Sequence, residues 1–141
     1  MTYMSELAVF PDLSIEENIR IGAQALGHAN PRIDDLYETF PVLRDKRRAP
    51  ASSLSGGQRK MLGIDKALAA EPRLLVMDEP SAGLSPLFVK EVIRILSDLR
   101  GRGLALLIAE QNIGFLEVDP RVRARRRPYP LFRNGGRDDR Q

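Results

Sequence analysis

The sequence predicts an α/β fold with a parallel sheet, and three observations carry that prediction. The second half of the chain alternates an apolar strand, an amphipathic helix and another apolar strand through short links, as neighbouring parallel strands do. The first of these strands ends in two carboxylates, Asp78 and Glu79. A glycine-rich turn at residues 54–58 precedes this unit and opens a helix.

The first half of the chain is predicted to be mainly helical. Residues 1–12 form a short, partly extended segment. Ser14 and Glu17 then have the spacing of a capping box, which places the start of a helix over about 15–27. The apolar residues that share one face of this helix are Ile15, Ile19, Ala23 and Leu26.

The middle of the chain leads into the first strand of the predicted sheet. A short helix is expected over about 32–40, and the basic segment 41–53 is expected to be a solvated loop. A longer helix follows over about 56–70. The strand at 73–78 is almost uniformly apolar, which predicts a parallel strand covered on both faces. The buried residues predicted for the longer helix are Met61, Leu62, Ala67 and Leu68.

A helix and a second strand complete the predicted unit. Ser85 followed by Pro86 is typical of an N-cap with proline at the first helical position. The helix ends near Gly101 and Gly103, and residues 104–109 form the second buried strand. The apolar residues carried by this helix are Leu87, Val89, Val92, Ile93, Leu96 and Leu99.

The composition excludes several kinds of site. The chain has no cysteine and one histidine, so it cannot build a disulfide framework, a thiolate metal site or a multi-histidine centre. Its net charge of +3 comes from residues 119–141, which hold eight arginines and three aspartates, while residues 1–118 carry a net −2. The basicity therefore says nothing about the partners of the first 118 residues.

The residues around the predicted sheet suit nucleotide chemistry. The turn at 54–58 opens a helix, so it offers backbone N–H groups and a positive dipole end to an anion. Asp78 can hold magnesium through a water, Glu79 can orient an attacking water, and Gln111 can reach a γ-phosphate. These side chains should converge at the carboxyl end of the strands, where ligands bind in open α/β folds. Taken singly, the same features also fit a capped helix start, a solvated strand end and a polar loop residue.

At these residues the chain resembles the ATP-binding subunit of ABC transporters. The resemblance covers about residues 3–118 and implies a partial nucleotide-binding domain over 1–118, with its helical subdomain at about 13–55. The segments that resemble the signature motif, the Walker B motif, the D-loop and the switch region are, in that order, 54–58, 74–79, 81–85 and 109–112.

The resemblance assigns roles and implies ATP and Mg²⁺ as cofactors. Glu79 would be the catalytic carboxylate, and Asp78 would bind magnesium through a water. Gln111 takes the place of the usual switch histidine; because glutamine is a poor proton carrier, it would position or sense the phosphate. The residues that would contact the γ-phosphate of ATP held by the opposite subunit are Ser55, Gly56, Gly57 and Gln58.

Finer details are similar to the branched-chain amino acid importers. Residues 9–18 resemble the segment after the Q-loop in those proteins, and Gln111 and the Ser85-Pro86 pair resemble their LivF-type ATPase subunit. This resemblance implies a second ABC ATPase subunit and transmembrane permease subunits as partners, with no nucleic acid. It also implies a cytoplasmic subunit held at the inner face of the plasma membrane through the permease.

One part of the family pattern is absent from the 141 residues. No Gly-x-x-x-x-Gly-Lys-Ser/Thr loop occurs, and each of the four lysines lacks a preceding glycine. Glu6 lies near the Q-loop position, a metal-contacting position in the family, although the spacing to Phe10 is one residue short. We expect an N-terminally truncated chain that is inactive alone. The alternative is a non-catalytic remnant or pseudogene product without autonomous ATP binding.

The C-terminal segment 119–141 is expected to be a basic, disordered tail. One back-translation of residues 118–129, shifted by one base, gives a sequence close to the family pattern, which suggests a frameshift product. The arginine run at 121–127 also admits binding to nucleic acid or anionic lipid, and a functionless tail is the favoured interpretation.

Overall fold

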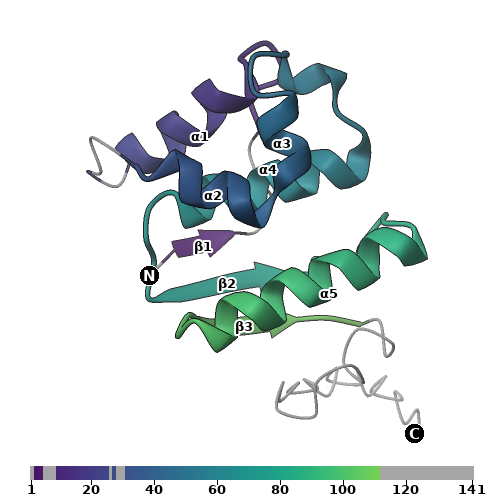
Figure 1. Cartoon of the computed structure of the whole chain (residues 1–141). Coiled ribbons are helices and arrows are strands. Elements are labelled where there is room, and N and C mark those ends of the chain that lie inside the picture. Colours follow the sequence, from purple (N-terminus) through teal and green to yellow (C-terminus); the bar gives the residue numbers. More distant parts are fainter. Residues whose placement is uncertain (1, 5–8, 26, 28–30, 112–141) are drawn as a thin grey trace, which may run out of the picture.

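The computed structural model of the chain describes residues 2–4, 9–25, 27 and 31–111 (Figure 1). A group of helices lies over one edge of a parallel sheet, and a long helix lies against one face of that sheet. Leu26, His28, the boundary at 118/119 and the whole basic tail are outside the described residues. The predicted α/β class is confirmed.

The helical group contains α1 (Ile15–Gln24), α2 (Ile33–Thr39), α3 (Pro41–Asp45) and α4 (Gly56–Leu68). The capping box of α1 is confirmed, because the Glu17 N–H donates to Ser14 Oγ at 3.2 Å and Glu17 Oε2 accepts from the Ser14 N–H at 2.8 Å. The buried face of α1, Ile15, Ile19 and Ala23, is also as predicted. This face packs on α4 in the common core.

The sheet has the order β1 (Thr2–Met4), β2 (Leu74–Asp78), β3 (Ala105–Ala109), and both pairings are parallel. Thr2–Met4, within the segment that was predicted to be partly extended, is therefore a sheet strand. Helix α5 (Pro86–Gly101) joins β2 to β3 as the strand–helix–strand pattern predicts. Its N-cap is Ser85, with Pro86 in the first turn.

The predicted loop at 41–53 is wrong in part. It contains α3 and a 3-10 turn, η1 (Ala51–Ser53). Leu43 and Ala51 are fully buried in the core, so two apolar residues anchor a segment whose basic side chains stay exposed. Pro41 stands at the start of α3, where its missing N–H costs nothing.

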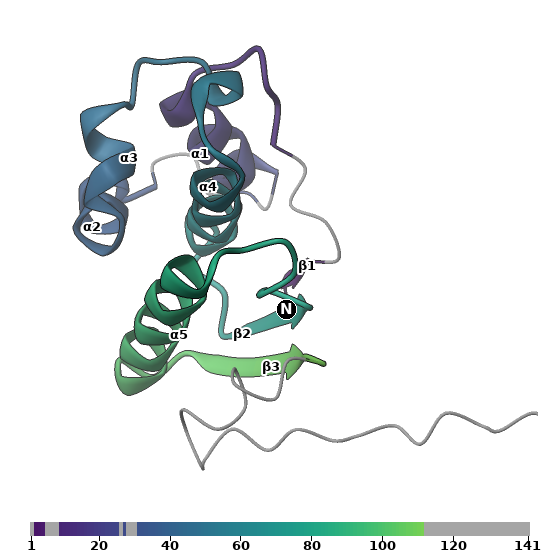
Figure 2. The same ribbon diagram turned by 90° about the vertical axis from the view of Figure 1, so that its right-hand side faces the viewer.

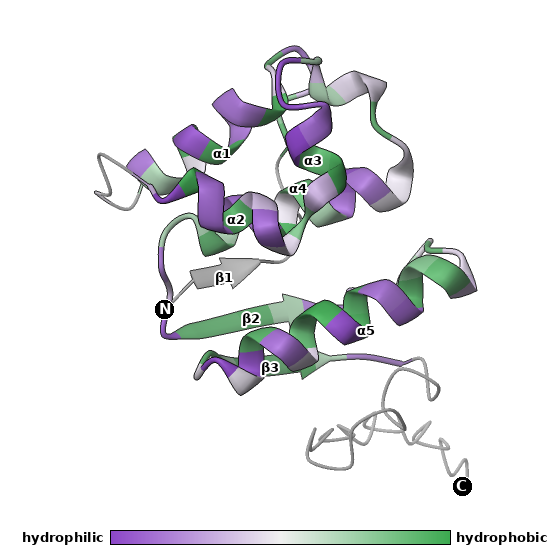
Figure 3. Cartoon of the chain, in the orientation of Figure 1, coloured by the Kyte–Doolittle hydropathy of each residue, from purple (hydrophilic) through white to green (hydrophobic). Residues whose placement is uncertain are grey.

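The prediction that the strands are covered on both faces is also wrong for the described residues. Leu75 and Met77 point into the core, whereas Leu74 and Val76, on the opposite face, are only partly buried. Leu107 of β3 is 57% exposed. Among the described helices, α5 lies against one face of β2 and β3, and no described helix lies against the other (Figure 2). Apart from Asp78 at the end of β2, both strands consist of apolar residues (Figure 3).

Candidate functional site

The carboxyl end of the sheet brings together three of the predicted site residues. Asp78 ends β2 with an exposed side chain and is in register with Ala109, the last residue of β3. The Glu79 N–H donates to the Ala109 carbonyl at 2.7 Å, so the pairing continues one residue past the strand. Gln111, also exposed, lies two residues beyond Ala109. The two strand ends thus place Asp78, Glu79 and Gln111 on one rim.

Glu79 has a backbone conformation that most residues avoid. Its φ of 46° lies in the left-handed region, which costs a non-glycine residue of order 1–3 kcal/mol. Such a conformation persists only where surrounding contacts enforce it. The bond from the Glu79 N–H to β3 is one of these contacts.

Glu110 connects the loops that follow the two strands. Its Oε2 accepts from the Ser81 N–H at 3.1 Å, and its Oε1 accepts from the Gln111 N–H at 2.9 Å. The sequence places Glu110 in the switch region but gives it no role. Its partner Ser81 is nearly thirty residues away in the chain, so only the sheet pairing reveals the bridge.

The start of α4 has the geometry of an open helix N-terminus. The Gln58 N–H donates to Ser55 Oγ at 3.2 Å, and Gln58 Oε1 accepts from the Ser55 N–H at 3.2 Å, which forms a second capping box. Gly56 is exposed, and a Cβ added to it would meet nothing within 4 Å. An anion can therefore approach the first-turn N–H groups, which have no acceptor within the helix.

Gly57 is enclosed by other residues, whereas Gly56 faces open space. Gly57 is buried, and a Cβ added to it would lie 2.7 Å from Cδ1 of Phe88. Phe88 belongs to the first turn of α5, where its N–H donates to Ser85 Oγ at 3.5 Å. The glycine is required here by packing against the ring.

Lys60 joins α4 to the loop after β2. Its Nζ donates to the Ala82 carbonyl at 2.6 Å and to the Glu79 carbonyl at 3.3 Å. Partial burial lowers the pKa of Lys60, and the nearby charges of Glu110 and Glu79 oppose that shift. Sequence reasoning missed this residue, although it lies three positions after Gly57 and so on the same side of the helix.

The residues present fit a magnesium nucleotide at the strand ends. Asp78 is exposed there and free to hold a hydrated magnesium ion, which retains several waters in most protein sites. No group of three acidic or histidine side chains that could cage a metal ion occurs within the described ranges. Glu6 lies outside those ranges, so its predicted metal contact stays a prediction.

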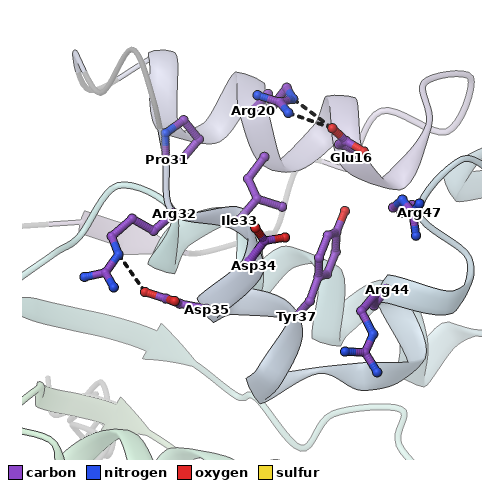
Figure 4. Close-up of a pocket in the computed structure, with 10 residues that line it drawn as sticks. All are labelled: Glu16, Arg20, Pro31, Arg32, Ile33, Asp34, Asp35, Tyr37, Arg44 and Arg47. Atoms are coloured by element: carbon purple, nitrogen blue, oxygen red, sulfur yellow. Dashed lines mark hydrogen bonds and ion pairs between the residues drawn. The ribbon is translucent and has the colours of Figure 1, made fainter.

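A pocket lies between α1 and the segment that carries α2 and α3 (Figure 4). Its volume is about 590 Å³, and two ion pairs on its wall, Arg20–Glu16 and Arg32–Asp35, each measure 2.7 Å. The other lining residues are Pro31, Ile33, Asp34, Tyr37, Arg44 and Arg47. None of the predicted site residues lines this pocket.

Comparison with known proteins identifies the family. The family described as ABC transporter matches residues 1–82, which is more than half of the chain. The chain belongs to the ABC transporter family. This match includes the turn at 54–58 and the carboxylates Asp78 and Glu79 at the end of β2.

Two curated relatives and one solved structure illustrate the match. BraG of Pseudomonas aeruginosa, a high-affinity branched-chain amino acid transport ATP-binding protein, is 36% identical over 74% of this chain and 46% of its own length. LptB of Haemophilus influenzae, a lipopolysaccharide export system ATP-binding protein, is 35% identical over 77% of this chain and 46% of its own length. The structure of CbiO1 from Clostridium perfringens, part of the ABC transporter complex CbiONQ, has a TM-score of 0.70 at 26% identity and covers 81% of this chain and 48% of that one.

The chain spans about half the length of the relatives it matches. No helix in the described part of this ABC-family chain has both the length and the apolar character needed to cross a bilayer.

Proposed function

We propose that this chain is part of an ATP-hydrolysing ABC subunit and supplies its signature turn and its catalytic carboxylate. The observation that carries the proposal is the rim where the loops after β2 and β3 meet. There, Glu79 is held in a left-handed backbone conformation directly after the exposed carboxylate of Asp78. Backbone strain at a residue with a suitable side chain is common at functional sites.

The roles of the rim residues follow from the chemistry of phosphoryl transfer. Asp78 would hold the magnesium ion through a water, and the bound magnesium nucleotide would supply the reacting phosphate and the neutralising charge. Glu79 would orient the attacking water and accept its proton. Gln111 would donate to a phosphate oxygen through its amide, which positions the phosphate without carrying a proton.

The start of α4 would act on a nucleotide held by another subunit. The exposed Gly56 and the first-turn N–H groups that the capping box does not engage favour a phosphate oxygen there. The residues that would form this contact are Ser55, Gly56, Gly57 and Gln58. A second ABC ATPase subunit is therefore one proposed partner, and a transmembrane permease that holds the pair at the cytoplasmic face of the membrane is the other.

The proposed solute class is branched-chain or similar amino acids. The similarity to BraG and the glutamine at position 111 support it. The similarity to LptB is nearly as high, so overall identity alone does not select the solute.

The 141 residues by themselves are expected not to bind or hydrolyse ATP. They contain no Gly-x-x-x-x-Gly-Lys-Ser/Thr loop, whose backbone N–H groups and lysine hold the β- and γ-phosphates. Titration calorimetry of the purified chain with magnesium-ATP should give no heat of binding above that of buffer. Magnesium-dependent binding or phosphate release by the chain alone would contradict this expectation.

The role of Glu79 can be tested in a chimera. The stretch of BraG that aligns with this chain is replaced by the corresponding stretch of this chain, and phosphate release is measured. We expect hydrolysis that falls about 100-fold or more when Glu79→Gln removes the carboxylate. Glu71→Gln, an exposed residue before β2, is the matched control and should leave the rate unchanged. Equal rates for the parent and the Glu79→Gln chimera would exclude the catalytic role.

A second candidate is a non-catalytic remnant that contributes at most a signature turn to a partner. The exposed Gly56 at the start of α4 is the feature that would serve this role. A folded chimera without any hydrolysis would select this alternative.

A further inference from the structure

The loop between β2 and α5 is held by side chains from two other parts of the fold. Lys60 of α4 donates to the carbonyls of Glu79 and Ala82, and Glu110 after β3 accepts from the Ser81 N–H. These contacts engage three of the four residues 79–82. The loop therefore has a fixed backbone path although Ala82 and Gly83 are exposed.

Glu79 in particular is fixed on both sides of its Cα. Its N–H donates to the Ala109 carbonyl at 2.7 Å, and its own carbonyl accepts from the Ala82 N–H at 3.0 Å and from Lys60 Nζ at 3.3 Å. The two peptide groups that flank the Cα set φ and ψ, and hence the direction of the side chain. With φ at 46°, relaxation to an ordinary conformation would swing the carboxylate away. The strain at Glu79 thus requires such anchors.

The charge and the surroundings of Lys60 favour strong hydrogen bonds to the loop carbonyls. An ammonium group donates stronger hydrogen bonds than a neutral donor, and this one is partly withdrawn from water. The 2.6 Å distance to the Ala82 carbonyl is at the short end for an N–H donor. A second contact with α4 follows this loop, where Phe88 in the first turn of α5 lies close to Gly57.

We propose that Lys60 is a positioning residue for Glu79. It ties the helix that begins with the signature turn to the loop that carries the carboxylate, so a displacement of α4 moves Glu79. The consequence for catalysis rests on the proposed function, in which the turn acts on the partner's nucleotide and Glu79 acts on the nucleotide of its own subunit. Lys60 then links the two nucleotide sites of the pair mechanically.

The proposal can be tested on the full chain without nucleotide. Because the chain has no cysteine, Ala82→Cys gives a single attachment point for a spin label on the exposed loop. In this background Lys60→Met keeps the aliphatic stem and removes the donors. We expect the rotational correlation time of the label to fall by about two-fold or more, while circular dichroism and the unfolding midpoint stay close to those of the parent.

Two further variants separate positioning from general stability. Lys60→Arg retains a cationic donor and is expected to restore at least half of the lost label order, whereas Lys90→Met, on the exposed side of α5, should leave the label unchanged. If Lys60→Met does not fold, Lys60→Gln, which retains a shorter donor, is measured in its place with the same expectation of a more mobile label. A folded Lys60 variant whose label is as immobile as in the parent overturns the proposal.

The spin-label experiment and the chimera experiment test separate claims. Because the label is measured without nucleotide, a negative result for Lys60 does not contradict the proposed function. A chimera without hydrolysis likewise does not contradict the positioning role of Lys60.

Discussion

Replacing Asp65 with asparagine is expected to remove most of the pH dependence of stability between about pH 4 and pH 8. Asp65 lies in α4 with a fully buried side chain, and neither carboxylate oxygen has a hydrogen-bond partner in the described part of the chain. Burial without a partner disfavours the charged form and raises the pKa of Asp65 to about 8.

The direction of the pH dependence follows from proton binding. In the unfolded chain Asp65 loses its proton near pH 3.8, whereas in the folded chain it keeps the proton up to about pH 8. The folded state therefore binds more protons in this window, and stability falls as pH rises, by up to about 1.4 kcal/mol per pH unit. Below pH 4 both states are protonated and the stabilisation is fully present. Above pH 8 both states are charged, and the dependence ends.

Urea unfolding at pH 5 and pH 8 measures the effect. The parent should be clearly more stable at pH 5, while Asp65→Asn, which has the same shape and does not titrate, should have nearly equal midpoints at both values. Asp45→Asn, on the exposed side of α3, is the control and should retain the parent's difference. A parent chain that is equally stable at both values would contradict the buried, partnerless state of Asp65.

The position of Asp65 is one feature that helical spacing could have revealed. Met61 and Leu62 lie one turn before it and Leu68 one turn after it, and all three are buried. Charged residues in helices are usually exposed, so Asp65 was not predicted to be buried. The apolar residues one turn before and after it nevertheless place it on the buried face. The residues that were predicted to be buried in α4 therefore already defined the environment of Asp65.

Local features of the fold were predictable, and contacts between elements were not. The capping boxes at Ser14 and Ser55 depend on residues three positions apart, so the sequence contains all of the required information. The bond from Lys60 to Ala82 depends on how α4 sits against the loop after β2, and no pattern within either segment specifies that placement. The buried Leu43 escaped prediction because the apolar run at 40–43 is short and is followed by basic residues, so it shows no helical period.

The candidate site likewise has a part that the sequence predicts and a part that depends on contacts between elements. The parallel direction of β2 and β3 follows from the strand–helix–strand pattern, so the predicted meeting of Asp78 and Gln111 at one rim required no side-chain detail. Asn18 shows what such reasoning omits. It is a buried amide whose Oδ1 accepts from the Phe10 N–H at 2.7 Å and whose Nδ2 donates to the Phe10 carbonyl at 2.9 Å. It fixes the loop before α1, yet its neighbours in the sequence give no sign of a buried polar residue.

The adjacent glycines at the start of α4 are expected to respond in opposite directions to substitution by alanine. Gly57→Ala places a methyl group 2.7 Å from Cδ1 of Phe88, well inside van der Waals contact, so the partly buried ring must shift to make room. Overpacking of this kind costs about 1–3 kcal/mol. Gly56→Ala meets open space at a helical position, so it should be neutral or stabilise the fold by up to about 1 kcal/mol through the helix preference of alanine.

Urea unfolding of the two variants provides a matched comparison, because they differ by one position and carry the same chemical change. The reason for the loss in Gly57→Ala can be isolated with Phe88→Ala, which removes the ring that the new methyl group would strike. In that background Gly57→Ala should cost much less than in the parent, which would show as a coupling energy between the two positions. If the cost of Gly57→Ala were the same with and without the ring, the contact between α4 and α5 would not be the reason for glycine at position 57. The conformational freedom of glycine would then be the remaining explanation, although Gly57 does not have a positive φ.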